Sequence, residues 1–266
     1  MSAWRSSVVR YQLLLFVALT YPLSWWAVPF AQGALIPHGP ALAAIVVVGL
    51  TEGRPGLRRF WRRCTNWRAG WWYLIGPAVI AAYLLAAYII SQLLGVSVTT
   101  AIQLPSAAVL LNLLLLGGLW EEPGWTGYAL PALQERFGRR RDGVLIATLL
   151  LGTIRAFWHL PLVLSGAIAW YDAAFFSLAL QVTITWVYNR SNGSVPAVMV
   201  THFASNVLAG ATMLVAFSGS ERAMYYVLFV ICACLIALTI LWRSQFRLGY
   251  REILLQPGVQ PGDWQG

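Results

Sequence analysis

Apolar runs alternate with short polar segments along almost the entire chain. Most of these runs approach the roughly 20 apolar residues that an α-helix needs to cross a bilayer. The pattern therefore predicts an all-α, polytopic membrane protein with about eight transmembrane helices. The predicted spans are residues 11–31, 34–50, 71–94, 106–130, 143–165, 173–189, 195–217 and 223–242.

Two of the predicted spans are expected to be irregular. The second is short and contains Pro37 and Pro40, and proline fits an α-helix only in its first turn. The fourth contains Glu121, Glu122, a proline and two glycines towards its end, so its helix boundary is ambiguous. The first run is longer than the roughly 7–15 apolar residues of a signal peptide and is predicted to remain as a span.

No internal repeat divides the chain. Residues 1–255 are therefore predicted to form a single integral membrane domain. Residues 256–266 are rich in Pro, Gly and Gln, and this composition predicts a disordered cytosolic tail.

The composition agrees with a membrane protein. Apolar residues make up 59% of the chain and charged residues 10%, with a mean hydropathy of +0.67. Soluble domains carry about 45–50% apolar and about 25% charged residues. These values exclude an ordinary cytosolic globule, a disordered chain and a nucleic-acid-binding protein. The three cysteines indicate neither a disulfide framework nor a metal site, because Cys232 and Cys234 lie in an apolar run where Cys behaves as a small hydrophobe.

The arginines predict how the chain is oriented. All 18 basic residues are arginine, which suits a GC-rich bacterial genome and a bacterial plasma membrane. With the N-terminus inside and eight spans, every arginine falls on the cytosolic side except Arg155, within a span, and Arg222, outside. Such a bias predicts that both termini lie in the cytosol. The cluster from Arg54 to Arg68 is read as part of this signal, with binding to anionic lipid headgroups as the alternative.

A few ionisable side chains lie within the predicted spans. A charge at the bilayer centre costs about 2.5–3.5 kcal/mol on insertion scales, so such residues normally face a polar cavity inside the bundle and carry function. They are Glu121, Glu122, Arg155, His159 and His202.

Glu121 and Glu122 are expected to have different roles. Adjacent residues on a helix point about 100° apart. One carboxylate can therefore enter the cavity as a general base, while the other holds a neighbouring helix. The alternative is that both are solvated at the cytosolic end of the fourth span. Arg155 needs an anionic partner at this depth, and Glu121 or Glu122 is the expected one.

His202 and Asn206 lie four residues apart and so share one helix face. They can stabilise a developing oxyanion, or simply bridge helices. His159 taken alone is more typical of a packing histidine. Together the three helices suit a site that activates water, or a zinc held by Glu121, His159 and His202.

At these residues the sequence resembles the CPBP family of intramembrane proteases, which includes the CAAX prenyl-protein endopeptidases and bacterial proteins linked to bacteriocin self-immunity. The first family motif is Glu-Glu-x-x-x-Arg, running on to Leu-Pro-x-Leu-Gln, and residues 121–134 follow it closely. The second commonly ends in Trp-His-Leu-Pro-Leu and matches residues 158–162. The third, His-x-x-x-Asn, matches His202 and Asn206. The resemblance covers roughly residues 106–210.

The resemblance implies an intramembrane endopeptidase, called a metalloprotease by convention although a metal-free glutamate mechanism has also been argued. Glu121 would activate water together with His159. His202 and Asn206 would stabilise the oxyanion, and Glu122 would be a supporting carboxylate. One position departs from the family, because its motif arginine is Thr126 here.

Arg155 is a candidate to supply the missing cation from another helix. The expected partners are a peptide or membrane-protein substrate and the lipid bilayer. Counting residues from the cytosolic ends puts His159 and His202 at different depths, which an offset or tilted fifth helix would reconcile.

Three functions remain open from the sequence. The first is an endopeptidase whose site opens to the cytosol, either Glu/His-dependent without metal or zinc-dependent. The second is a weakly active or inactive scaffold or immunity protein on the same fold, which Thr126 favours. The third is a small transporter, although the inverted repeats typical of transporters are not found.

Overall fold

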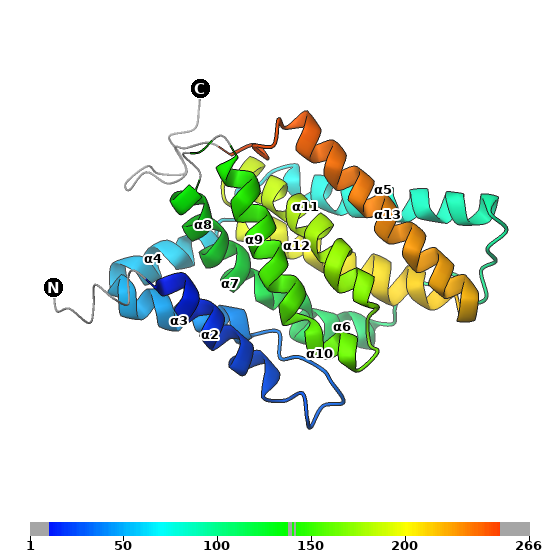
Figure 1. Cartoon of the computed structure of the whole chain (residues 1–266), viewed down its shortest axis with the longest axis horizontal. Coiled ribbons are helices and arrows are strands. Elements are labelled where there is room, and N and C mark those ends of the chain that lie inside the picture. The colour runs from blue at the N-terminus through cyan, green and yellow to red at the C-terminus, as the bar shows by residue number, and fades with distance from the viewer. Residues whose placement is uncertain (1–10, 138–139, 141, 251–266) are drawn as a thin grey trace.

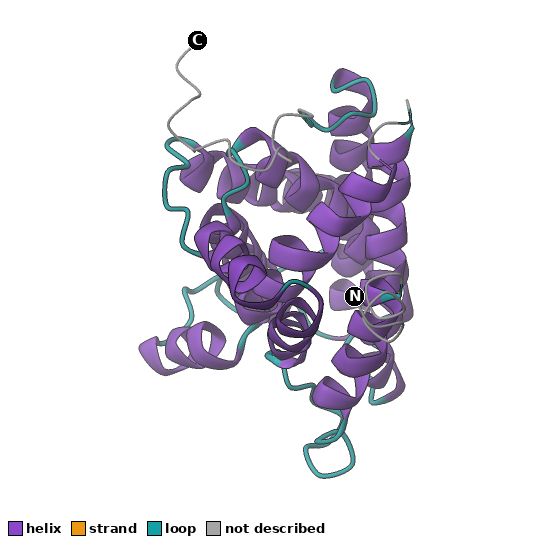
Figure 2. Cartoon of the chain, turned by 90° about the vertical axis from the view of Figure 1, so that its left-hand side faces the viewer, coloured by secondary structure: helices purple, strands orange, loops and turns teal. Residues whose placement is uncertain are grey.

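The computed structural model describes residues 11–137, 140 and 142–250. These residues form helices and no strand, as predicted (Figures 1 and 2). Among them, three helical stretches are long and apolar enough to cross a membrane: Trp72–Leu93, Val195–Ala216 and Gly219–Arg243. The other predicted spans are shorter or interrupted helices, so the number of eight crossings stays a prediction. The predicted tail, residues 256–266, lies outside the described residues.

Between residues 11 and 121 the described chain forms six helical elements. They are α2 (Gln12–Trp25), α3 (Gly39–Thr51), α4 (Gly53–Cys64), α5 (Trp72–Leu93), α6 (Ala107–Leu116) and the 3-10 turn η1 (Gly118–Glu121). Helix α3 begins with Pro40 in its first turn, as expected from its sequence. Helix α4 was not predicted as an element; it lies in the arginine-rich segment between the second and third predicted spans.

Eleven further elements follow from residue 122 to residue 243 among the described residues. They are α7 (Glu122–Gly124), η2 (Trp125–Ala129), α8 (Leu130–Phe137), α9 (Gly143–Trp158), α10 (Leu160–Leu164), η3 (Asp172–Phe176), α11 (Ser177–Arg190), α12 (Val195–Ser205), η4 (Asn206–Met213), η5 (Leu214–Ala216) and α13 (Gly219–Arg243). The elements η2, η3 and η4 are π-helical.

The fourth predicted span is broken where the two glutamates lie. Helix α6 ends at Leu116, and Gly117 is extended with φ −88° and ψ 171°. A Cβ on Gly117 would collide with the carbonyl oxygen of Leu113, so glycine is required for this turn. The chain then resumes through η1, α7 and η2 into α8, which continues to Phe137, beyond the predicted end at residue 130. The break places Glu121 and Glu122 at the start of a new helix.

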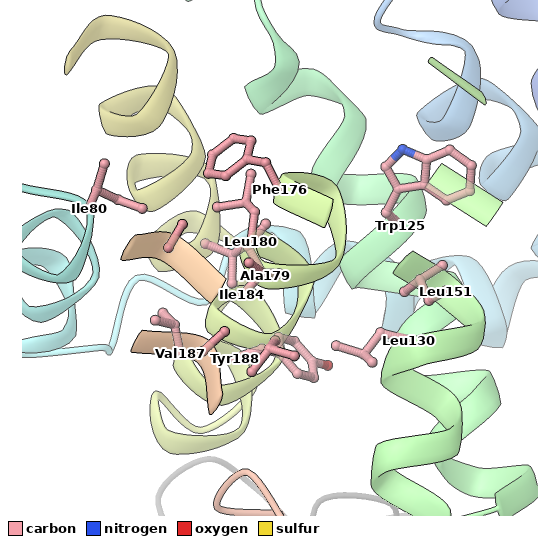
Figure 3. Packing of buried hydrophobic residues seen from close by; sticks show 14 of the residues in the cluster. Ile80, Trp125, Leu130, Leu151, Phe176, Ala179, Leu180, Ile184, Val187 and Tyr188 are labelled. Atoms are coloured by element: carbon pink, nitrogen blue, oxygen red, sulfur yellow. The ribbon is translucent and has the colours of Figure 1, made fainter. Parts of the chain in front are cut away.

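Helix α11 forms the centre of the core. Apolar side chains on several of its faces, including Leu180, Ile184 and Val187, are buried. A helix that is apolar all round is typically enclosed by others. Figure 3 shows these side chains gathered between neighbouring helices, with Trp125 and Leu151 nearby. The buried polar residues of α11, such as Gln181, can therefore reach only other interior groups.

Small residues allow neighbouring helices to pack closely. Gly76 of α5 lies against Thr201 of α12, so a Cβ at this glycine would collide with Oγ1 of Thr201. Gly124 lies against the backbone of Pro40 in α3. Membrane helices commonly use small residues to bring backbones together in this way. These two contacts fix α12 and α7, the elements that carry His202 and Glu122.

The arginines gather at one end of the bundle. Asn66 Nδ2 donates to Asn192 O at 3.0 Å, and Ser194 Oγ donates to Asn66 O at 2.6 Å, which joins the α4–α5 and α11–α12 connections. Arg190 shares one groove with the end of α13, and Asp142 shares another. We call this the arginine-rich end. Its described arginines are Arg54, Arg58, Arg59, Arg62, Arg63, Arg68, Arg136, Arg140, Arg190, Arg243 and Arg247.

The opposite end is formed by the remaining connections. Thr99 N donates to Ala216 O at 2.9 Å, and Tyr226 Oη donates to Asp172 Oδ2 at 2.6 Å. Gly33 packs against Ser165. In Figure 1, α9 begins and α13 ends near the top, whereas α10 and the beginning of α13 lie lower in the view. We call this the distal end, and Arg222 at the start of α13 belongs to it.

Candidate active site

Four ionisable residues from three separate segments meet in the interior. Glu121 and Glu122 come from the break between η1 and α7, Arg155 from α9 and His202 from α12. Each is almost fully buried, with 5%, 0%, 3% and 6% of its surface exposed, in that order. The sequence predicted that these residues face a common interior, and the structure brings them into contact. The alternative of two solvated glutamates at the cytosolic end of a span is contradicted by this burial.

Glu122 is held on all sides. Its Oε1 accepts a hydrogen bond from Arg155 Nη2 at 2.9 Å and lies 2.7 Å from His202 Nδ1. Its Oε2 accepts a hydrogen bond from the hydroxyl of Thr126, one turn along its own helix. A buried carboxylate is tolerated when it is paired and its lone pairs are filled. Glu122 therefore ties α7, α9 and α12 together and has no side open to a substrate.

Glu121 is held much more loosely. Its one ion-pair contact is a long one, 3.4 Å from Oε2 to Arg155 Nη2. Its other oxygen, Oε1, faces Gly118, where an added Cβ would lie 2.8 Å from that oxygen and 2.5 Å from His202 Nε2. Glu121 and His202 therefore both lie against Gly118 at the wall of one cavity, and this close approach is possible because residue 118 has no side chain. The two adjacent glutamates thus have different surroundings, as their positions on the helix predicted.

Arg155 is the cation that pairs with the two glutamates. Its Nη2 lies between the two carboxylates and its Nη1 donates to Gln181 Oε1 at 3.1 Å. Gln181 in turn donates to Thr185, so the guanidinium is oriented by α11. The sequence left open which glutamate pairs with Arg155, and the structure shows contacts to both, the shorter one to Glu122.

His159 and Asn206 line the same cavity as Glu121 and His202. His159 stands at the junction of α9 and α10, and its buried Nδ1 has no hydrogen-bond partner among the described residues. Asn206 begins η4, one turn after His202. His159 and His202 line one cavity, although residue counting put them at different depths. The roles of these residues in catalysis remain predictions.

The arrangement does not fit a resident zinc ion well. Among the described residues, no group of three or more His, Cys, Asp and Glu side chains is placed to hold a metal. Arg155 Nη2 already lies against both carboxylates and 3.5 Å from His202 Nδ1. A second cation there would be repelled by the guanidinium. The predicted ligand set of Glu121, His159 and His202 therefore has no support in this geometry.

The site lies at the inner end of a cavity of about 580 Å³. Its wall is largely apolar and includes Phe176, Leu180 and Phe229, and its rim includes Ala34, Ala167 and Arg222. These rim residues belong to the distal end. Polar groups at the bottom of an apolar cavity are typical of sites that bind and orient a substrate.

Three contributors to the site were missed by reasoning from the sequence. Gly118 stood within the fourth span without a motif to mark it. Thr126 was noted only as a departure from the family, and its hydrogen bond to Glu122 was not expected. Gln181 carried a usable signal, since it is a polar residue in the middle of the predicted span 173–189.

Comparisons with known proteins match this part of the chain. Residues 102–208 match the family described as Type II CAAX prenyl endopeptidase Rce1-like. The chain is 32% identical over 108 residues to a protein of Methanococcus maripaludis named CAAX prenyl protease 2. That match covers 36% of this chain and 38% of the relative, so the similarity concerns a little over a third of each. The family match contains both glutamates, Arg155, both site histidines and Asn206.

Proposed function

We propose that the protein is an intramembrane endopeptidase that cleaves a peptide bond near the membrane. The similarity of residues 102–208 to Rce1-like CAAX endopeptidases supports this proposal. One observation carries the proposal. Glu121 Oε1 and His202 Nε2 border the same space beside Gly118, at the bottom of a cavity, while the neighbouring Glu122 is fully occupied. This is the geometry expected of a base and a hydrogen-bonding group that act on one reacting centre.

In the proposed reaction, Glu121 accepts a proton from a water molecule, and His159 helps to position that water. The water oxygen forms a bond to the carbonyl carbon of the scissile peptide, and the carbonyl oxygen becomes an oxyanion. His202 Nε2 and the Asn206 amide donate hydrogen bonds to it. The carbon–nitrogen bond then breaks, and Glu121 returns the proton to the leaving amine. The products are a carboxylic acid and an amine, and the acid then passes its proton to the amine to give a carboxylate and an ammonium group.

Glu122 and Arg155 are proposed as positioning residues. Glu122 Oε1 lies 2.7 Å from His202 Nδ1, and a carboxylate there accepts the Nδ1–H and fixes the ring orientation. For Nε2 to donate as well, the ring must be an imidazolium. One guanidinium and one imidazolium then balance the two carboxylates, so the buried group is neutral as a whole. Arg155 keeps the carboxylates together and directs Glu121 towards the cavity.

We propose that this chemistry proceeds without a metal ion, since the guanidinium of Arg155 already pairs with Glu121, the one carboxylate of the predicted ligand set. Purified protein treated with EDTA is expected to keep its activity. Loss of activity that zinc restores would contradict this part of the proposal and leave the peptidase assignment intact.

The test is cleavage of a quenched-fluorescence peptide library, half of it lipidated, by the protein in liposomes. Glu121→Gln and His202→Ala are each expected to lower kcat by about 100-fold or more, because general-base catalysis contributes about 10²–10⁴. Glu135→Gln is the matched control, since Glu135 is exposed on α8 and outside the site. Full cleavage by Glu121→Gln would refute the proposed mechanism.

The alternative is an inactive scaffold or immunity protein on the same fold. It drew its support from Thr126 in place of the motif arginine. The contacts of Arg155 with both carboxylates supply the cation by another route and so remove that reason. Absence of cleavage across the library, with a cellular function that survives Glu121→Gln, would favour the scaffold.

A further inference from the structure

The cavity borders each neighbouring helix along one half only. On α11 and the preceding η3, the residues that line it end at Leu180, and none lies in the half that leads to Arg190. On α9, only the last turns contribute, beginning at Arg155. The lining halves of both segments point to the distal end, because α9 runs away from the arginine-rich end and α11 runs towards it.

The other two long segments show the same asymmetry. From α12 through η5, the lining begins at His202 and continues to Leu214, and nothing from residues 195–201 takes part. On α13, Arg222, Tyr226 and Phe229 line the cavity, and nothing from residues 230–243 does. Thus four independent segments place the cavity on the distal side of the Glu121–His202 level.

The rim confirms this direction. Ala34, Ala167 and Arg222 line the cavity and are themselves exposed. Ala34 and Ala167 come from two different connections of the distal end, and Arg222 comes from the first turn of α13. None of the described arginines of the arginine-rich end lines the cavity. A molecule that reaches Glu121 through this rim therefore enters from the distal end.

Arginine-rich ends of membrane proteins face the cytosol, because positively charged segments are retained there. We infer that the cavity opens on the extracytoplasmic face of the membrane, and that its substrate is a polypeptide segment exposed on that face. The substrate part of this inference rests on the proposed endopeptidase function, whereas the direction of the opening does not. It replaces the expectation of a site open to the cytosol.

The lining indicates which part of a polypeptide fits. Phe176, Leu180 and Phe229 present an apolar wall between the rim and the catalytic groups. At the rim, Arg222 has no ion-pair partner among the described residues, and the carboxylate of Asp172 is occupied by Tyr226. The cavity thus suits an apolar peptide segment that carries a negative charge outside the scissile bond, such as a carboxylate near its end.

Cysteine labelling tests the direction of the opening. The native Cys64, Cys232 and Cys234 are replaced by serine, and a single cysteine is introduced by Ala167→Cys at the rim or by Thr65→Cys at the arginine-rich end. Both positions are exposed. A membrane-impermeant maleimide is applied to intact spheroplasts of a bacterial host and to lysed membranes.

Ala167→Cys is expected to be labelled in intact spheroplasts at least about ten times more than Thr65→Cys, which should be labelled only after lysis. The reverse pattern, equal labelling of both in intact spheroplasts, or no labelling of Ala167→Cys even after lysis would each overturn the inference. Arg222→Cys is a second rim variant, which guards against a local effect at residue 167.

A second experiment separates this inference from the proposed function. An impermeant peptide that the purified protein cleaves is added to right-side-out and to inside-out vesicles. Cleavage at least about ten times faster in right-side-out vesicles supports the inference, and the opposite preference overturns it. If the rim is labelled from outside and the protein cleaves no peptide, the endopeptidase proposal fails and the opening direction stands.

Arg222 is tested with matched peptides of the same sequence. Arg222→Gln is expected to raise KM about ten-fold for a peptide with a free C-terminal carboxylate and to leave KM unchanged for its amide. Equal effects on both peptides would refute the role of Arg222 and leave the opening direction untouched.

Discussion

Arg155 contacts three polar side chains in the interior, Glu121, Glu122 and Gln181. Replacing it with Ala leaves Glu122 with only His202 and Thr126 for partners. Breaking a buried ion pair typically lowers the free energy of unfolding by about 3–5 kcal/mol. We expect a loss of this size for Arg155→Ala, measured by denaturant unfolding in micelles.

The matched double variant distinguishes charge from packing. Arg155→Met together with Glu122→Gln removes both members of the pair and keeps most of the volume. We expect this double variant to be at least about 1 kcal/mol more stable than Arg155→Met alone, because the orphaned carboxylate is gone. Stability losses that simply add would show that the two side chains are not coupled.

Gly118 is expected to matter for activity because any side chain at this position would collide with Glu121 and His202. In Gly118→Ala the new methyl would lie 2.5 Å from His202 Nε2 and 2.8 Å from Glu121 Oε1, so both side chains would have to move from their present positions. We expect kcat/KM to fall by about 100-fold or more, as for the loss of one oxyanion donor. Peptide cleavage in liposomes measures this.

Gly49→Ala is the control for this substitution, since Gly49 lies in α3 and a Cβ there meets only Leu57, at 3.9 Å. Its activity should match that of the wild type. If Gly118→Ala cleaves peptides as fast as Gly49→Ala, the space beside Gly118 is not where the reaction occurs.

At the scale of helices, the contact between α5 and α12 controls where His202 lies. Gly76→Ala would drive a methyl into the Thr201 side chain, next to His202. Overpacking of this kind typically costs about 1–3 kcal/mol. We expect both the free energy of unfolding and kcat to fall, because α12 must shift away from α5.

A second substitution, at Thr201, should relieve this collision. Thr201→Ala removes Oγ1, the atom that the new methyl meets most closely, and should restore at least half of the stability lost in Gly76→Ala. If the stability loss of the double variant equals the sum of the losses in the two single variants, Gly76 and Thr201 are not in contact. Thermal unfolding of the wild type, both single variants and the double variant in the same detergent gives the double-mutant cycle.

A comparison of predicted and observed helices shows what the hydrophobic pattern could predict. It predicted the long α5 and α13 within a few residues, because both are continuous and uniformly apolar. It missed α4, whose residues are too charged to read as a span, and it joined α6 to α8 across the break at Gly117. Such breaks depend on single backbone positions that an apolar run does not reveal.

At the scale of the whole molecule, the arginine-rich end carries a strong positive field without matching carboxylates. Only two ion pairs with carboxylates are found there among the described residues, Arg59–Glu52 and Arg140–Asp142. Anionic headgroups attract such clusters with about 1 kcal/mol per arginine near the surface. We expect a melting temperature several degrees higher in nanodiscs with anionic lipid than with zwitterionic lipid alone.

Salt should weaken this difference, since the screening length falls to about 3 Å at 1 M ionic strength. A difference that is unchanged by salt would point to bilayer thickness or acyl-chain packing instead of charge. Replacing Arg58 and Arg62, which are both exposed on α4, by Gln should also reduce it.

The sequence alone determined the helical class, the segregation of arginines and the set of buried ionisable residues, because apolar runs and charges are properties of the residues themselves. It also predicted that Arg155 needs an acidic partner. Only the tertiary structure decided that Glu122 is held on all sides while Glu121 faces Gly118, and that the cavity points to the distal end. These features depend on how helices are rotated and offset, and that is set by contacts between distant residues, such as Gly76 with Thr201 and Gly124 with Pro40.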